Sequence, residues 1–306
     1  MKKFAKIVLA TAVALSVLPG IAQAQAKKFV VGYTNLADTD VFTMSRKNAF
    51  IEASKKDAEV SISFSDAQGD ASKQLDQIDN FIAQKVNVIV VVPVDYQGIV
   101  PGVEKANKAG IPVIALGIES AGGKYTFVGS KNIDAGRMQG EYMAKTLPKN
   151  AQIVYLQGEP GLYHSKERLE GFTKAMAGRT DVKVLANLPA NYDRAQGMKV
   201  TEDWVQKFPK FDALIAANDQ MALGALQALK TAGRKGVSIS GIDGVKDALD
   251  AIKAGDMSQS IFQNAKGQAQ GAFDVVEMIK KGQAAPKEKL IPFESIVKDN
   301  VANYMK

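Results

Sequence analysis

Few side chains in this sequence have the type and spacing that catalysis requires. His164 is the only histidine among 306 residues, which excludes a multi-histidine metal centre. A serine–histidine–acid hydrolase would have to use His164, and its neighbour Ser165 cannot supply the required geometry through adjacency alone. We therefore expect His164 at the surface or beside a helix cap. The chain has no cysteine, which excludes disulfides, a thiol nucleophile and a thiolate metal site.

The acidic pair in Asp38-Thr39-Asp40 is the other candidate for chemistry. A calcium loop starting at Asp38 would need its closing glutamate where the chain has Ala49, so we expect no calcium. Two carboxylates also raise the possibility of a glycosidase. Acids two residues apart more often form turns or accept hydrogen bonds from hydroxyl groups. Because the patterns GxGxxG, GxxxxGK[ST] and GxSxG are also missing, the sequence predicts no catalytic residue, no cofactor and no metal.

The elements that must position these residues alternate between apolar, β-rich runs and amphipathic helical stretches. Several runs in the first half are apolar without alternation, as in strands covered by helices on both faces. The strands expected there are Phe29–Thr34, Val60–Phe64, Val88–Val92, Pro112–Leu116 and Thr126–Val128. The helices expected between them are Phe42–Lys56, Ala71–Gln84 and Gln97–Lys108.

The same alternation starts again in the second half. The strands expected there are Ile153–Leu156, Val182–Asn187, Ala213–Ala216 and Val237–Ile242. The helices expected between them are Ser165–Met176, Asp193–Lys207 and Gln220–Thr231. A last helix, Gly267–Lys281, and a strand near Leu290–Ile296 complete the chain.

Two successive βαβ series predict an α/β protein with two doubly wound, Rossmann-like parallel-sheet lobes joined by a multi-strand hinge. Residues 27–130 with 264–292 are expected to form the N-terminal lobe, and 131–263 with 293–306 the C-terminal lobe. Ligands of such sheets bind beyond the carboxyl ends of the strands. The two lobes would therefore present their strand-end loops to one shared cleft.

The first 26 residues have the layout of a secretory signal peptide. A basic head with three lysines precedes an uncharged apolar run from Ile7 to Leu18 and a tail of alternating small residues. The apolar run is shorter than the roughly 20 residues of a membrane-spanning helix. Cleavage after Ala24 or after Ala26 fits equally well, and an anchored N-terminal helix is the alternative.

The charge distribution gives no indication of a nucleic-acid partner. The formal net charge is +7, of which the leader lysines contribute three, and the remaining charges alternate in sign along the chain. No second long apolar run follows the leader, and a lipid-anchored binding protein would need a cysteine at the cleavage site. We therefore expect a protein free in a Gram-negative periplasm, with its signal peptide cleaved.

Several short segments, taken in order, carry a resemblance to a known family. In the second half they are Ser165–Phe172, Pro189–Asp193, Ala217–Leu226, Gly241–Gly244 and Ser260–Gln263. In the first half they are Asp66–Gln74, Val92–Asp95 and Ala109–Val113. In this order they resemble the periplasmic sugar-binding proteins of the ribose/galactose type, over the whole mature chain. The resemblance implies the type I periplasmic binding protein fold.

The resemblance also implies a set of polar and aromatic side chains that reach into the cleft. These are Arg168, Tyr192, Asn218, Asp243 and Gln263, with Phe42 on the other lobe. A polyol suits such a set because each hydroxyl group both donates and accepts hydrogen bonds. Asp243 would accept hydroxyl protons, Arg168 would donate in a fork, and the aromatic faces would cover the C–H face of a ring.

Each of these residues also has a purely structural interpretation. Asp243 could form a turn, and Asn218-Asp219 could cap the following helix, which is the role we favour for Asp219. Arg168 could pair with Glu170 or Glu141 on a solvated face, and Phe42 could belong to the core. The family order favours the binding role for Arg168, Asn218, Asp243 and Gln263.

One position departs from the family pattern. Sugar binders of this type usually carry Asp-Arg or Asn-Arg after the strand that here ends at Leu116, whereas this chain has Gly117-Ile118. The N-terminal lobe thus lacks a charged fork and an acceptor at that place. Asp38, Thr39 and Asp40, at the end of the first strand, are the candidates that would supply the missing acceptors.

The identity of the ligand stays open between a monosaccharide such as ribose and a cyclitol such as myo-inositol. The segment Asn35–Thr43 resembles the inositol and rhizopine branch more than the ribose branch, and Phe127–Ser130 and Ala135–Tyr142 point the same way. The Gly117-Ile118 departure applies to that branch as well.

We therefore expect a monomeric binding protein that closes on a small polyol or sugar by hinge motion and delivers it to an inner-membrane ABC permease. A ligand-presenting receptor for a chemoreceptor or sensor kinase is the alternative. A lactose-repressor-type regulator would need a helix-turn-helix where the leader stands. A secreted enzyme is the remaining possibility.

Overall fold

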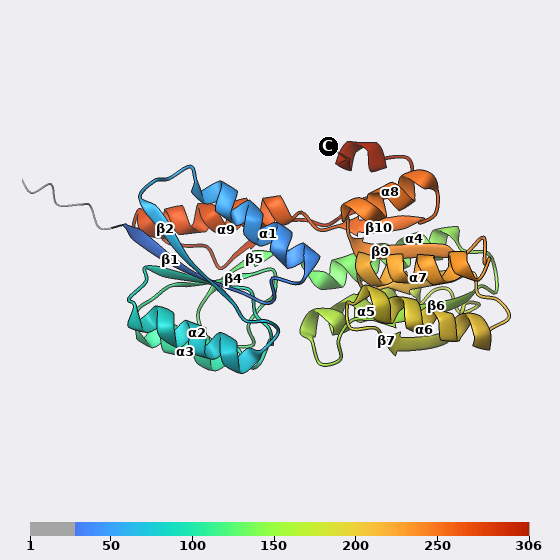
Figure 1. The fold of residues 1–306 in the computed structure, drawn as a ribbon, viewed down its shortest axis with the longest axis horizontal. Helices are drawn as coiled ribbons and strands as arrows, with labels where there is room; N and C mark the ends of the chain where they lie inside the picture. Colours follow the sequence, from blue (N-terminus) through green and yellow to red (C-terminus); the bar gives the residue numbers. More distant parts are fainter. Residues whose placement is uncertain (1–27, 306) are drawn as a thin grey trace, which may run out of the picture.

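The computed structural model describes residues 28–305, so the predicted signal peptide lies outside the described residues. Two α/β lobes lie side by side along the long axis of the molecule (Figure 1). Each lobe contains one six-stranded sheet, and helices cover both faces of each sheet. No helix within the described residues is long and apolar enough to cross a membrane.

The N-terminal lobe is built from the first part of the chain and one late helix–strand pair. Its strands are β1 (Phe29–Asn35), β2 (Val60–Asp66), β3 (Val88–Val91), β4 (Val113–Leu116), β5 (Thr126–Gly129) and β11 (Glu288–Leu290). Its helices are α1 (Val41–Ser54), α2 (Ala71–Ala83), α3 (Val100–Lys108) and α9 (Ala265–Lys280).

The C-terminal lobe repeats this construction. Its strands are β6 (Gln152–Gln157), β7 (Lys183–Pro189), β8 (Ala213–Ala216), β9 (Ser238–Asp243), β10 (Gln259–Phe262) and β12 (Glu294–Ile296). Its helices are α4 (Asn132–Thr146), α5 (Tyr163–Met176), α6 (Arg194–Lys207), α7 (Asp219–Thr231) and α8 (Lys246–Ala254), followed by a 3₁₀ turn at Val301–Tyr304.

The two sheets have the same strand order. The N-terminal sheet runs β2-β1-β3-β4-β5-β11 and the C-terminal sheet runs β7-β6-β8-β9-β10-β12. Both are the 2-1-3-4-5 order of doubly wound sheets, in which the chain reverses direction beside the first strand and opens a crevice there. The predicted fold class is confirmed, with one difference: β12 pairs antiparallel with β10.

The central strands of the N-terminal sheet are apolar because helices bury both of its faces. Alternate residues of a strand point to opposite faces. Val88 and Val90 therefore face the core under α1 and α9, whereas Ile89 and Val91 face the core under α2 and α3. Because both faces are covered, the run Val88–Val91 is apolar without interruption and fully buried.

The structure contains elements that the sequence patterns did not reveal. Helices α4 and α8 and strand β10 lie in stretches for which no element was predicted. The single strand expected near Leu290–Ile296 is wrong, because Ile291–Phe293 separates two short strands that belong to different sheets. The chain crosses between the lobes three times: between β5 and α4, between β10 and α9, and between β11 and β12.

Helices α4 and α5 approach each other so closely that glycine is required at the contact. A β-carbon on Gly136 of α4 would lie 1.8 Å from the carbonyl oxygen of Arg168 on α5, and one on Gly171 would lie 2.0 Å from the carbonyl oxygen of Ile133. This contact fixes the position of the turn of α5 that carries Arg168. Small residues at the crossing explain why α4 shows no strong amphipathic pattern.

Replacing Gly136 with alanine is expected to destabilise the protein by about 1–3 kcal/mol, because the added methyl group must push α5 away from α4. Urea unfolding of G136A against the wild-type protein measures the effect. Gly178→Ala is the matched control, since a β-carbon there meets no atom within 4 Å, and its effect should stay within about 0.5 kcal/mol. Equal stabilities of G136A and wild type would contradict the close contact.

Candidate ligand-binding site

The carboxyl ends of the strands of both sheets face one cavity between the lobes. The cavity encloses about 120 Å³ and is lined by side chains of both lobes. From the N-terminal lobe these are Leu36, Asp40, Phe42, Thr43, Arg46, Gly117 and Ile118, and from α4 onward they are Asn132, Glu159, Leu162, His164, Arg168, Tyr192, Asn218, Asp243 and Gln263.

Arg168 stands at the centre of the C-terminal side of the cavity, on the second turn of α5. Its guanidinium donates from Nε to Asn132 Oδ1 at 3.0 Å, from Nη1 to the carbonyl oxygen of Ala217 at 2.6 Å and from Nη2 to Gln263 Oε1 at 3.2 Å. The side chain is 5% exposed. It does not lie on a solvated face with Glu170, which pairs with Lys174 instead.

Asp243 ends strand β9 with its carboxylate at the cavity. None of the residues 28–305 donates a hydrogen bond to this carboxylate in the structure. Burial raises the pKa of Asp243 well above its usual range, against the opposing effect of Arg168. Its φ of 129° is one that side-chain-bearing residues rarely adopt, at a cost of about 1–3 kcal/mol. A strained, buried acceptor without a protein donor indicates a ligand contact.

Asp219 holds the loop that follows Asp243. The prediction that Asp219 caps the helix that follows it is wrong, because the N-cap of α7 is Asn218. Its carboxylate accepts hydrogen bonds from the backbone N–H groups of Gly244 and Val245 and from the Ser260 hydroxyl. Asn218 is the N-cap of α7 and accepts from the N–H of Met221 at 3.0 Å. Because Asn218 also lines the cavity, its structural and binding roles are compatible.

Aromatic rings border the cavity on both sides. Tyr192 lies under the Arg168 guanidinium, with 5.9 Å between the ring centroid and Cζ, and stacks on His164 at 5.2 Å. Phe42 lies under the guanidinium of Arg46 in the same way, at 5.4 Å. Tyr192 packs against the core of the C-terminal lobe, whereas Phe42 belongs to no hydrophobic core cluster, so the proposal that Phe42 is a core residue finds no support.

His164 is a cavity residue that sequence reasoning placed at the surface or beside a cap. It is the second residue of α5, and its ring turns into the cleft, where Nδ1 has no partner. Burial, followed by the charges of Arg168 and Arg46, lowers the pKa of His164 to about 3. The imidazole is therefore neutral near pH 7 and offers one donor and one acceptor.

Arg46 on α1 is a further cavity residue that the sequence analysis missed. It is 2% exposed and donates from Nη1 to Gln268 Oε1 at 2.9 Å, while its Nε has no partner. Burial lowers the pKa of Arg46, and Tyr33, Asp40 and Asp243 oppose that change. Its position four residues after Phe42 on the same helix is the pattern that could have indicated it.

The acidic residues at the end of β1 divide into two groups. Asp40 caps α1 by accepting from the Thr43 N–H at 2.7 Å, and it lines the cavity. Asp38 does not line the cavity: it pairs with Lys47 at 2.5 Å and accepts from Asn35. Thr39 is exposed and also outside the lining. The structure thus brings seven of the nine predicted site residues together and leaves Asp38 and Thr39 apart.

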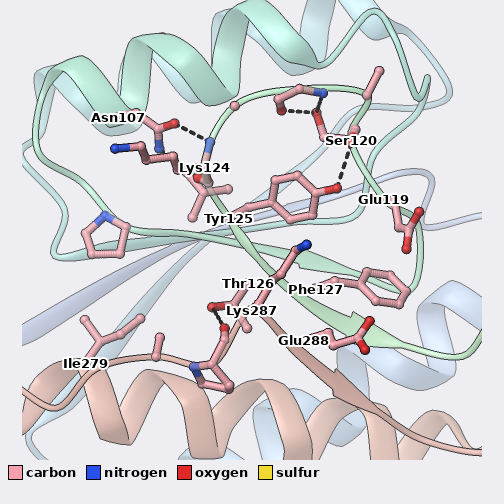
Figure 2. A pocket seen from close by; sticks show the side chains of 17 residues that line it. Asn107, Glu119, Ser120, Lys124, Tyr125, Thr126, Phe127, Ile279, Lys287 and Glu288 are labelled. Carbon is pink, nitrogen blue, oxygen red and sulfur yellow. Dashed lines mark hydrogen bonds between the residues drawn. The ribbon is translucent and has the colours of Figure 1, made fainter.

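A larger hollow of about 690 Å³ at the edge of the N-terminal lobe is a poorer candidate (Figure 2). Several of its polar groups are already used within the protein: Asn107 bonds to Lys124, the Tyr125 hydroxyl donates to the carbonyl of Ser120, and Thr126 donates to the carbonyl of Pro286. Its charged side chains are half-buried, as Glu119 is, or exposed, whereas Arg46, Arg168 and Asp243 at the interlobe cavity are buried. Across residues 28–305, no group of three or more His, Cys, Asp or Glu is arranged to hold a metal ion.

Comparison with known proteins agrees with this geometry. Residues 31–284 match the family described as periplasmic binding protein domain. This chain belongs to that family. A protein of Rhizobium meliloti whose name assigns it to rhizopine binding is 35% identical over 90% of this chain and 92% of its own length. The ribose import binding protein of Escherichia coli is 30% identical over 97% of this chain and 99% of its own.

A solved structure shows the same arrangement of lobes. An ABC transporter solute-binding protein from Bacillus halodurans, with bound myo-inositol, superposes with a TM-score of 0.87 and 34% identity, covering 91% of this chain and 97% of that one. The family resemblance predicted from the ordered strand-end segments is therefore confirmed.

This periplasmic binding protein has contacts between its lobes beside the cavity. Tyr96, in the loop after β3, stacks on Tyr163 of α5 with 4.2 Å between ring centroids and 10° between planes. Glu119 of the N-terminal lobe and Glu167 of α5 lie near this stack. Burial, followed by repulsion from Glu119, raises the pKa of Glu167 to about 7, and burial raises the pKa of Glu119.

The Glu167 carboxyl is expected to contribute a loss of stability as pH rises from about 4.5 to about 7. In this window the folded carboxyl retains a proton that the unfolded chain has lost, so ionisation disfavours the folded state. Glu167→Gln removes the effect, and its stability relative to wild type should increase by about 1 kcal/mol across the window, since the side chain is partly screened by solvent.

Urea unfolding at several pH values compares the two proteins. Glu104→Gln, on the exposed side of α3, serves as control and should parallel the wild-type curve. Parallel curves for E167Q and wild type would show that the Glu167 carboxyl does not titrate in this range.

Proposed function

We propose that this protein captures a small polyhydroxylated ligand between its lobes and delivers it to an inner-membrane ABC permease. The observation that carries the proposal is the Asp243 carboxylate, which is buried in the cavity without a donor from the described residues. A buried carboxylate left unpaired is costly. A ligand hydroxyl group that donates to it would remove that cost.

The other cavity groups suit the same ligand. A polyol hydroxyl that donates to Asp243 can accept from Arg168, and the amides of Asn218 and Gln263 can both donate and accept. Phe42 and Tyr192 border the cavity with apolar ring faces, which suit the C–H surface of a sugar or cyclitol ring. We propose these six residues and Asp40 as the ligand-binding set. The function requires no catalytic residue and no cofactor.

Hinge closure is the proposed mechanism. The three crossings between the lobes would form the hinge and divide the chain into 27–130 with 264–292 and 131–263 with 293–306. Because the cavity is lined by both lobes, a ligand contacts both only when they are closed. Its differential affinity then shifts the population toward the closed form, which the permease would recognise.

The class of ligand follows from the chemistry and from the relatives. The names of the similar proteins report rhizopine and ribose, and the similar structure holds myo-inositol. For this chain we propose a monosaccharide or a cyclitol. We further propose that residues 1–26 direct the chain to the periplasm and are cleaved, and that the mature protein is a monomer.

Asp243→Asn is expected to weaken polyol binding by about 10- to 100-fold, because it removes a charged acceptor of ligand hydroxyl groups. Titration calorimetry with a panel containing myo-inositol, D-ribose and xylitol measures the change. Asp250→Asn is the matched control, since its carboxylate pairs with Lys246 on an exposed turn of α8, and it should bind like wild type. If no small polyol gives saturable binding to the wild-type protein, the proposed ligand class is wrong.

Measuring the uptake of labelled ligand distinguishes a transport function from a signalling function. A strain that lacks this protein should fail to take up the labelled ligand, and the gene for D243N should not restore uptake. Intact uptake in the deletion strain would indicate a receptor that presents its ligand to a chemoreceptor or sensor kinase.

A further inference from the structure

Arg46 and Arg168 occupy equivalent positions in the two lobes. Each is the sixth residue of the helix that follows the first strand of its sheet. Each guanidinium lies over an aromatic ring, Phe42 in one lobe and Tyr192 in the other, and each donates to a glutamine. The cavity is therefore bordered by a buried cation from each side.

The two lobes differ in what stands at the end of the fourth strand. In the C-terminal lobe, β9 ends in Asp243, whose carboxylate faces the cavity. In the N-terminal lobe, β4 is followed by Gly117, and a β-carbon there would lie 1.8 Å from Arg46 Nη1. Gly117 also has a φ of 80°. The place of an acidic side chain is thus filled by the guanidinium of Arg46.

This exchange places a donor group, and no acidic side chain, at the end of β4 on the N-terminal side of the cavity. A guanidinium has five N–H donors and no acceptor. Nη1 of Arg46 is used by Gln268, and Nε has no partner. The carboxylate of Asp40 also lines the cavity, and one of its oxygens accepts a hydrogen bond from the backbone N–H of Thr43. On the opposite side, Asp243 can only accept while it is ionised.

We propose that Arg46 forms a donor-only subsite that binds a ligand oxygen carrying no proton, such as a carbonyl, ether or carboxylate oxygen, as readily as a hydroxyl group. The inference rests on the proposed function, and it adds a selectivity: one position of the polyol tolerates oxidation but not removal of its oxygen. The positions that face Asp243 require a hydroxyl proton and do not tolerate either change.

The ligand itself provides the first test and needs no variant. The wild-type protein is titrated with myo-inositol, or with D-ribose if that binds more tightly, and with its monodeoxy and monoketo derivatives. At one ring position the ketone should bind within about threefold of the parent, while the deoxy compound binds about 10- to 100-fold more weakly, as expected for a lost hydrogen bond to a charged donor. If every ketone binds as weakly as the deoxy compound at the same position, the subsite does not exist.

Arg46→Gln provides the second test. The variant should lose about 10- to 100-fold in affinity for the parent polyol and should no longer distinguish the parent from the deoxy compound at that position. Arg137→Gln is the matched control, because Arg137 pairs with Asp134 and Glu141 on the exposed side of α4, and it should bind like wild type. Unchanged affinity in R46Q would overturn the assignment.

Gly117→Ala tests whether the space at Gly117 admits Arg46. The added methyl group should displace the guanidinium and weaken binding, and the double variant G117A/R46Q should bind no more weakly than R46Q alone. Additive losses would show that Gly117 acts independently of Arg46. Failure of the wild-type protein to bind any polyol would instead reject the proposed function, so the two failures are distinguishable.

Discussion

Charge buried between the two lobes is the constraint on which the rest of the structure depends. Arg46, Arg168 and Asp243 are each less than a tenth exposed, and isolated burial of such groups is costly. Protein partners offset much of this cost for Arg168, which makes three hydrogen bonds, and less for Arg46 and Asp243. The protein therefore holds buried polar groups with few protein partners, and we propose that a bound solute supplies the missing hydrogen bonds.

The repeated topology explains how residues far apart in sequence reach one cavity. Both sheets have the 2-1-3-4-5 strand order, and the loops at the carboxyl ends of their strands open toward each other. The second turn of the first helix and the end of the fourth strand therefore meet at the same place in each lobe. Close packing secures these positions: Gly136 lets α4 rest on the backbone of Arg168, and Asp219 ties down the loop after Asp243.

Much of the fold and the C-terminal half of the site could be predicted from the sequence. Uninterrupted apolar runs such as Val88–Val91 indicate buried parallel strands, and the ordered segments around Arg168 and Asp243 identify the family. Helix α4 was not predicted, because glycines take the place of a clear apolar face where it meets α5. The place of His164 in the cavity was not predicted, because a single histidine forms no sequence pattern. Its position follows from stacking on Tyr192. Such contacts depend on three-dimensional packing that no local pattern encodes.

The departure at Gly117-Ile118 shows why ligand identity does not transfer position by position. In the sequence alone, Gly117 and Ile118 stand for the loss of an acidic or amide acceptor and of an arginine. In three dimensions the space beside Gly117 is filled by the side chain of Arg46, which comes from helix α1. A β-carbon on Gly117 would lie 1.8 Å from Arg46 Nη1. The cation is thus present from a different element, while no acidic side chain stands at the end of β4. A change of that kind alters which oxygen atoms of a polyol can be bound, although the fold, the hinge and the C-terminal half of the site stay the same.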